Sequence, residues 1–171
     1  GWYLYDELLR IPLIFSGNNI TENKIVKNQV ANVDVFPTVL DLIGLPPADA
    51  QIDGQSLVPL LKDESDRSNP IYLETASVLK DEPLGRMVGV RTSDYKYFRS
   101  RKSPNEKIHL YDLKNDSTEE NNLASINPEI VKEMELILSN FLVKSDANMS
   151  KELSDEETRS VEQELKKLGY L

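Results

Sequence analysis

Four short segments between residues 71 and 113 place the strongest constraint on the fold of this chain. They are residues 71–74, 87–90, 95–98 and 108–113, which are rich in aromatic and β-branched side chains and are separated by Ser, Asp, Asn and Pro. Such side chains suit a pleated, half-buried surface, and short polar connections join strands that run in opposite directions. The pattern predicts an antiparallel sheet.

A helix is predicted to follow this sheet and to cover it. Asn127 and Pro128 suit the start of a helix. The apolar residues that come next fall on one helical face: Ile130, Met134, Ile137, Leu138 and Phe141. A last helix is expected to begin at Ser154, which forms a capping-box pattern with Glu157, and to end at Gly169.

The first third of the chain has a different pattern. Residues 11–15 are apolar apart from Pro12 and predict a short buried strand, of the kind that parallel sheets hide on both faces. Asp34 is expected to cap a helix of about three turns, and Gly44 to end it. Asp53 and Gly54 predict a turn.

A polar stretch separates the two patterns. Residues 62–69 hold five charged side chains in eight positions, which suits a subdomain boundary. The sequence therefore predicts two parts, residues 1–62 and residues 63–171. Together they place the chain in the α/β to α+β class.

Composition excludes several kinds of function. The formal net charge of −9 and the 29% of charged residues oppose binding to nucleic acid or to an anionic membrane by general attraction. No apolar run reaches the 18 or so residues of a membrane span. The absence of cysteine excludes disulfides and thiolate metal sites, and it leaves the compartment open.

The residues alone offer no self-contained active site. There is one histidine, His109, and no clustered carboxylates at metal-ligand spacing, so no metal site is predicted. The side chain of His109 should lie on the face opposite that of Ile108 and Leu110, beside Tyr111, in a structural role. The basic cluster around Arg99 and Arg101 suits a solvated hairpin turn better than an anion site.

Several phrases of the sequence come in the order in which one known family carries them. They are LYDELLRIPLIF at 4–15, VDVFPTVLDLIGLP at 33–46, DGQSLVPLL at 53–61, VRTSDYKYFR at 90–99, LYDLKNDSTEENNLA at 110–124 and ELKKLGYL at 164–171. The chain resembles the C-terminal part of the type I, formylglycine-dependent sulfatases of the alkaline-phosphatase-like superfamily. The likeness covers nearly the whole chain.

The resemblance implies a fold and a parent enzyme. Residues 1–62 would end the large mixed sheet of the alkaline-phosphatase-like domain, and residues 63–171 would form a small C-terminal subdomain of antiparallel strands covered by a helix. The parent would hydrolyse sulfate esters with formylglycine and calcium. The CxPxR-type motif that supplies formylglycine is absent from this chain, and the family's calcium-binding residues would lie upstream of Gly1.

We therefore assign no catalytic residue, metal or cofactor to the chain itself, and expect it to be inactive alone. The family's C-terminal subdomain helps to shape the mouth of the substrate cleft, which makes Trp2, Tyr3, Arg99 and Arg101 candidate rim residues. Burial in the core is the alternative for the two aromatic residues. The sulfate-ester substrate would be bound through the missing N-terminal domain.

Two other interpretations stay open. Phosphonate and phosphodiester hydrolases of the same superfamily share much of this C-terminal pattern, and a Thr at the upstream nucleophile position would favour them. Alternatively, the chain is a non-catalytic interaction module. In either case an unpaired sheet edge in residues 1–62 would let the isolated chain form homo-oligomers.

Overall fold

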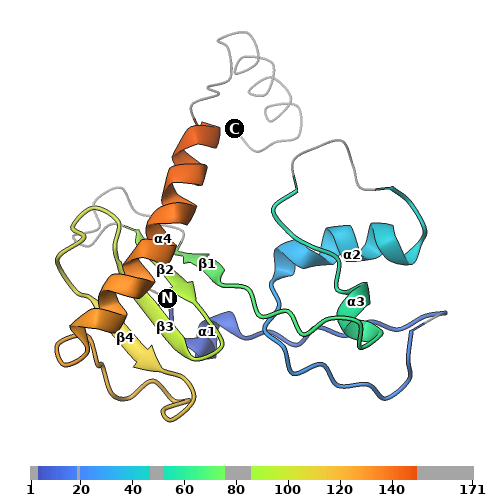
Figure 1. Ribbon diagram of the computed structural model, residues 1–171, viewed down its shortest axis with the longest axis horizontal. Coiled ribbons are helices and arrows are strands. Elements are labelled where there is room, and N and C mark those ends of the chain that lie inside the picture. Colours follow the sequence, from blue (N-terminus) through green and yellow to red (C-terminus); the bar gives the residue numbers. More distant parts are fainter. Residues whose placement is uncertain (1–3, 19, 47–51, 76–85, 150–171) are drawn as a thin grey trace, which may run out of the picture. The chain divides into compact units, whose positions relative to one another are not determined.

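The computed structural model describes residues 4–18, 20–46, 52–75 and 86–149 (Figure 1). The chain divides into two compact units, Gly1–Leu138 and Ser139–Leu171. This division does not coincide with the boundary predicted at residue 62, which stays a prediction. The expected helix from Ser154 to Gly169, and the residues Trp2 and Tyr3, lie outside the described residues.

The predicted antiparallel sheet is confirmed. Its strands are β1 (Ile71–Glu74), β2 (Met87–Arg91), β3 (Tyr95–Ser100) and β4 (His109–Asp112), and each pairs with its neighbour in the order β1-β2-β3-β4. In this register Arg91 lies opposite Lys96, and Val90 lies opposite Tyr97. Because directly opposed residues share a face of the sheet, the register divides the side chains into two sets.

We call the two surfaces the Lys96 face and the Tyr97 face. The Lys96 face carries Met87, Arg91, Lys96, Phe98, His109 and Tyr111, and the Tyr97 face carries Val88, Val90, Tyr97, Arg99 and Leu110. Both faces are covered, by segments from opposite parts of the chain. The predicted placement of His109 opposite Leu110 and beside Tyr111 is confirmed.

The first part of helix α4 (Pro128–Met149) covers the Tyr97 face, as predicted (Figure 1). The residues from Pro128 to Leu138 belong to the first unit, and two of them, Met134 and Leu138, are fully buried. Glu135 accepts a hydrogen bond from the hydroxyl of Tyr97. The helix thus supplies both apolar contacts and an acidic group to this face of the sheet.

The Lys96 face is covered by the beginning of the described chain. Helix α1 (Asp6–Leu9) is a single turn, and Leu4 just before it is buried in one core cluster with Met87, Phe98 and Tyr111. Tyr5 and Leu9 pack against the same cluster. This layer was absent from the sequence-based prediction.

The strand predicted at residues 11–15 is not formed among the described residues. The segment is extended, but no backbone hydrogen bond joins residues 11–16 to another described residue, and Ile11 and Ile14 are 68% and 85% exposed. A strand exists only where a neighbour pairs its N–H and C=O groups. The sequence pattern is that of a strand, and the described part of the chain offers it no partner.

The remaining elements of the first unit are the short helices η1 (Asn32–Asp34), α2 (Val35–Leu42) and α3 (Val58–Leu61). Gly44 ends α2 as predicted, with a left-handed φ of 73° that L side chains rarely adopt. The predicted cap by Asp34 is wrong, because its side chain makes no capping hydrogen bond to α2. Its carboxylate instead accepts from the backbone N–H groups of Ala31 and Gln55 and pairs with Arg67 at 3.0 Å.

The stretch predicted as a polar linker is tied to the residues before it. Besides the ion pair between Arg67 and Asp34, Asn28 donates to Asp66, and Gln29 donates to the carbonyl oxygen of Asn69. These bonds join positions 33 to 40 residues apart. The charged side chains of residues 62–69 therefore partly serve to hold loops together.

Candidate functional site

The most concentrated set of charged groups in the described chain lies on the Lys96 face. The side chain of Lys96 is 0% exposed, and its ammonium contacts the carboxylates of Asp6 and Glu119, the latter at 2.8 Å. Arg91 binds both oxygens of Asp6, at 3.1 Å from Nε and 2.9 Å from Nη2. Two cations and two anions thus form one nearly buried network.

The fold explains how the four groups meet. Arg91 and Lys96 are directly opposed on β2 and β3, so both point from the same face toward α1. Glu119 reaches them from the loop after β4, where it is buried and has a left-handed φ of 58°. Its second carboxylate oxygen accepts the backbone N–H of Asp6 at 2.7 Å. A non-glycine residue rarely adopts that conformation unless its surroundings compensate.

The network keeps Asp6 ionised. Burial by itself would raise the pKa of the Asp6 carboxyl, but the hydrogen bonds from Arg91 and Lys96 and their positive charges outweigh it, so the pKa lies below its usual value. A buried lysine without such partners would favour its neutral form. Charge neutrality inside the network is what makes its burial tolerable.

Aromatic contacts lie on the same face of the sheet as the charged network. The ring of Tyr5 meets Phe98 edge to face, with centroids 5.7 Å apart, and its hydroxyl lies 3.3 Å from that of Tyr111. The ring of His109 stacks on that of Phe98 with centroids 4.5 Å apart, and the Nδ1 atom of His109 lies 3.1 Å from the Tyr111 hydroxyl. These contacts fix the rings and support the structural role expected for His109.

We expect His109 to make the stability of the protein depend on pH below neutrality. Burial and the nearby Lys107 hold the pKa of His109 below its ordinary value of 6.5. As the pH falls, the unfolded chain therefore binds a proton at His109 before the folded chain does. Neutral His109 stabilises the fold fully above pH 6.5, and this stabilisation is lost as the pH falls through the pKa of His109 in the folded chain. Urea unfolding at pH 7.5 and 5.5 should show the loss. Because the chain has one histidine, His109→Gln should flatten it, and an unchanged slope in that variant would contradict the assignment.

The basic residues predicted at a cleft rim have specific partners. The side chain of Arg99 is 6% exposed, and its guanidinium binds both oxygens of Glu135, at 2.6 Å and 2.8 Å. This hydrogen bonding raises the pKa of Arg99 despite partial burial. Such burial does not support a rim position for Arg99. Arg101 is 30% exposed and lies 3.7 Å from Glu74, and its rim position stays a prediction, as do those of Trp2 and Tyr3.

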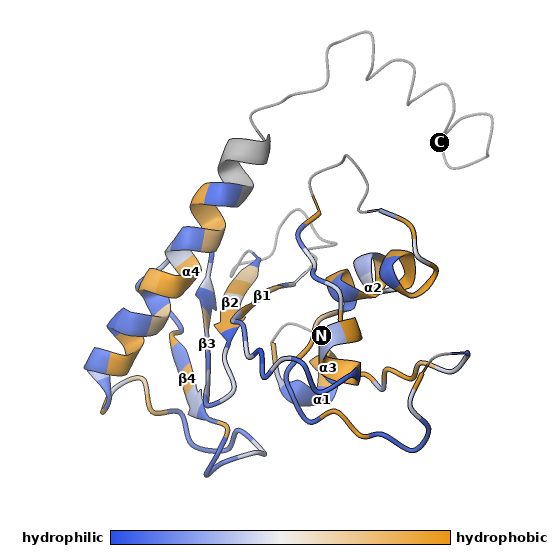
Figure 2. Ribbon diagram, turned by 45° about the vertical axis from the view of Figure 1, so that its right-hand side comes forward, coloured by the Kyte–Doolittle hydropathy of each residue, from blue (hydrophilic) through white to orange (hydrophobic). Residues whose placement is uncertain are grey.

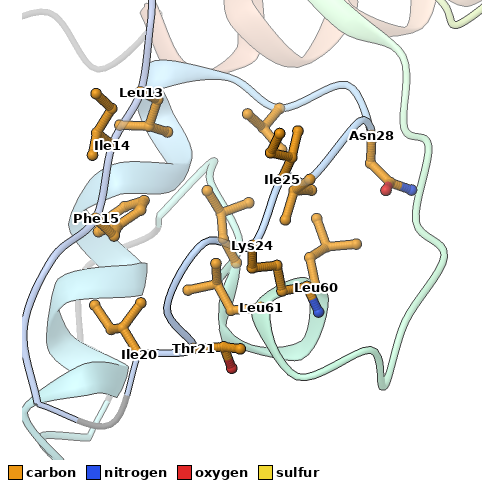
Figure 3. A pocket seen from close by; sticks show the side chains of 13 residues that line it. Leu13, Ile14, Phe15, Ile20, Thr21, Lys24, Ile25, Asn28, Leu60 and Leu61 are labelled. Carbon is orange, nitrogen blue, oxygen red and sulfur yellow. The ribbon is translucent and has the colours of Figure 1, made fainter.

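A second feature is a cavity of about 320 Å³ between the extended segment and α3 (Figure 3). Leu13, Ile14 and Phe15 line one side of it, and Leu60 and Leu61 line another. Lys24 contributes the main polar group and pairs with Asp63 at 2.6 Å. Most of the lining residues are apolar, so the cavity suits packing rather than chemistry.

The structure offers no metal centre in the ranges it describes: no group of three or more His, Asp or Glu side chains is placed to hold an ion. Within the same ranges, no helix has the length and apolar character needed to cross a membrane. The buried acids Asp6 and Glu119 are already engaged by cations. The charged network therefore has the character of a structural connection.

Sequence reasoning missed this network, although one signal for it was present. In the run YKYFR the alternation of a strand places Lys96 on the same face as Phe98, which marks the lysine as a buried cation in need of an acid. Nothing in the spacing indicated that the acid would be Asp6, 90 positions earlier.

Comparison with known proteins gives consistent similarities. A family model described as N-sulphoglucosamine sulphohydrolase, C-terminal, matches residues 1–146. Arylsulfatase K of Gallus gallus is 29% identical over 144 residues, which are 81% of this chain. Delta 4,5-hexuronate-2-O-sulfatase of Bacteroides thetaiotaomicron is 31% identical over 150 residues, which are 82% of this chain.

A solved structure gives the same relation in three dimensions. The crystal structure of a predicted sulfatase from Bacteroides thetaiotaomicron matches with a TM-score of 0.70 and 28% identity, over 90% of this chain and 34% of that one. The chain spans 27% of the length of the Gallus relative and 30% of that of the Bacteroides relative. The similarity thus covers most of this chain and less than a third of each of these two curated relatives.

Proposed function

The chain belongs to the family of N-sulphoglucosamine sulphohydrolase C-terminal regions, and from this membership we propose that it acts as the C-terminal scaffold of a longer sulfatase. The longer protein would hydrolyse sulfate esters, the chemistry that the names of the related proteins share. The observation that carries the proposal is the match of the family over residues 1–146. The alkaline-phosphatase-like fold of the parent follows from the same relation.

We propose that the catalytic chemistry lies outside this chain. Formylglycine forms from a Cys or Ser in a CxPxR-type motif, which the chain lacks. Calcium needs several free oxygen ligands, whereas the buried carboxylates of Asp6 and Glu119 are paired with Lys96 and Arg91. The described residues therefore do not fit either group, and no step of the reaction is assigned to them.

The scaffold role rests on a high number of exposed large apolar side chains in the first third of the chain. They include Leu8, Ile11, Leu13, Ile14, Ile25, Val33, Phe36, Val39, Ile43 and Leu45. Figure 2 shows apolar colouring along α2, the helix that carries Phe36 and Val39. Large exposed apolar patches mark interfaces in soluble proteins. In the proposal, the rest of the longer polypeptide covers these side chains.

The extended segment at residues 11–16 would take part in the same contact. Its backbone pairs with no other described residue and its side chains are apolar, which suits a strand that is added to a sheet of the longer protein. Without that sheet, the same edge would favour association between copies of the chain, which is the proposed origin of any homo-oligomer. The sulfate-ester substrate would be bound by the longer protein.

The test compares this chain with the polypeptide encoded by a reading frame that extends upstream of Gly1. We expect the longer protein to release sulfate from at least one member of a panel that holds an aryl sulfate and sulfated sugars. The chain alone should release none. Upstream sequence with a CxPxR or SxPxR motif would agree with this result. A Thr at the nucleophile position, with hydrolysis of an added phosphonate monoester or phosphodiester to its acid and alcohol, would instead favour the phosphonate and phosphodiester hydrolases.

A pair of matched variants tests the scaffold role in the longer protein. Ile14 and Ile126 are 85% and 69% exposed in this structure, and only Ile14 lies in the proposed interface. Ile14→Asp should reduce the yield of soluble, active longer protein at least tenfold, because a buried charge without a partner is costly. Ile126→Asp should leave it nearly unchanged. Equal effects of the two variants would argue against the interface.

A further inference from the structure

We propose that the Lys96 face is a self-contained binding site for a short peptide segment with an apolar, an aromatic and an acidic residue in succession. Residues 4–9 occupy this site within the same chain. The inference goes beyond the scaffold role, because it treats the segment as a ligand that is held by its own contacts. We call the site the clasp and residues 4–9 the clasp segment.

The clasp recognises three kinds of side chain. Leu4 is buried against Met87 and Phe98 in the core cluster. The ring of Tyr5 meets those of Phe98 and Tyr111 edge to face, at 5.7 Å and 5.9 Å between centroids. Asp6 is held by both Arg91 and Lys96. Each of the three consecutive residues therefore has its own complementary surface.

The clasp also binds the backbone of the segment. The N–H of Asp6 donates to Glu119 at 2.7 Å, across 113 positions of sequence. Glu119 pairs with Lys96 through its other oxygen, at 2.8 Å. One acid of the clasp thus orients the cation and the bound backbone together, and its left-handed φ of 58° indicates that the loop is built around this contact.

The charge of the clasp makes an acid in the segment necessary. With the segment bound, Lys96 lies where water does not reach it, and apart from Asp6 the only described carboxylate that pairs with Lys96 is that of Glu119. A neutral side chain at position 6 would leave an excess positive charge uncompensated. The site should therefore discriminate strongly between aspartate and asparagine in the bound segment.

The contacts that hold the clasp segment are made by residues 4–9 themselves rather than by the residues that follow them. Residues 11–18, which follow Arg10, are exposed apart from the half-buried Phe15 and make no backbone hydrogen bonds to other described residues. The contacts of Asp6 with the sheet and its loops join positions 85 to 113 residues apart. A cut after Arg10 should therefore leave the segment bound.

The experiment uses the full chain with the recognition sequence of a specific protease inserted after Arg10. After cleavage, we expect the fragment of residues 1–10 to elute with the rest of the protein in gel filtration. Trp2 is the only tryptophan of the chain, so its fluorescence anisotropy reports binding and release of the fragment. Immediate loss of the fragment from the cleaved protein would overturn the proposal.

Competition with synthetic peptides tests which groups are recognised while leaving the host protein unchanged. The peptide of residues 1–10 should displace the bound fragment, and the Asp6→Asn peptide should need at least a tenfold higher concentration. The Glu7→Gln peptide is the matched control, because Glu7 is an exposed acid of the same helical turn. Equal competition by the Asp6→Asn and Glu7→Gln peptides would also overturn the proposal.

Discussion

Replacing Lys96 by methionine should lower the free energy of unfolding by about 3–5 kcal/mol, the range found when one partner of a buried ion pair is removed. The ammonium of Lys96 lies between the carboxylates of Asp6 and Glu119 and is fully buried. Methionine keeps most of the length of the side chain but leaves Arg91 as the one cation of the network. Urea unfolding followed by circular dichroism would measure the loss.

Two comparisons make this result specific to the network. Lys62→Met removes the same charge from an exposed position and should change the stability by less than about 0.5 kcal/mol. Adding Glu119→Gln to Lys96→Met removes one of the two acids, and part of the lost stability should return. If Lys96→Met were as mild as Lys62→Met, the ion network would not stabilise the fold.

The substitution Gly54→Ala should destabilise the protein by about 3 kcal/mol, the upper part of the usual cost of overpacking. A Cβ at this position would lie 2.0 Å from the carbonyl oxygen of Val33 and 2.9 Å from the backbone nitrogen of Asp34. Both are backbone atoms, so no rotamer change can relieve the clash. Thermal unfolding would show the effect as a lower midpoint.

The consequence of Gly54→Ala should extend to the buried carboxylate of Asp34. Moving the two backbones apart would break the 2.8 Å hydrogen bond from Gln55 N–H to Asp34. Gly44→Ala is the natural comparison, because its added Cβ meets nothing within 4 Å and only the left-handed conformation is penalised, by about 1–2 kcal/mol. A smaller loss at Gly54 than at Gly44 would contradict the close approach.

Local patterns predicted much of this fold. The alternation and turn residues of 71–113 indicated the antiparallel sheet, and the helical spacing of Met134 and Leu138 indicated the helix that covers it. The end of α2 at Gly44 followed from the conformational freedom of glycine. Each of these features is determined by residues within a few positions of one another, which is why the sequence reveals them.

Contacts between distant positions were not predictable in the same way. Lys96 and its partner Asp6 are 90 positions apart, and Asp34 and its partner Arg67 are 33 positions apart. A capping role is the common use of an aspartate before a helix, so Asp34 was misassigned. The segment at 11–15 shows the opposite case: its pattern is correct for a strand, and the described part of the chain contains no neighbour for it.

The candidate site shows the same difference between features set by nearby residues and contacts between distant residues. Family membership could be inferred from phrases of sequence, whereas the state of Arg99 could not, because Glu135 lies 36 positions later on another element. A basic run near a turn usually points to solvent. Here the strand extends through Ser100, and alternation directs Arg99 toward α4.

The coverage of the sheet from both ends of the chain also has a consequence for biosynthesis. Asp6 leaves the ribosome 113 residues before Glu119, which at roughly 5–20 residues per second is a delay on the order of 10 s. During that time Leu4 and Tyr5 have no completed sheet to pack against. Nascent chains of this protein should therefore depend on chaperones that shield the early segment until translation has passed β4 and the loop that follows it.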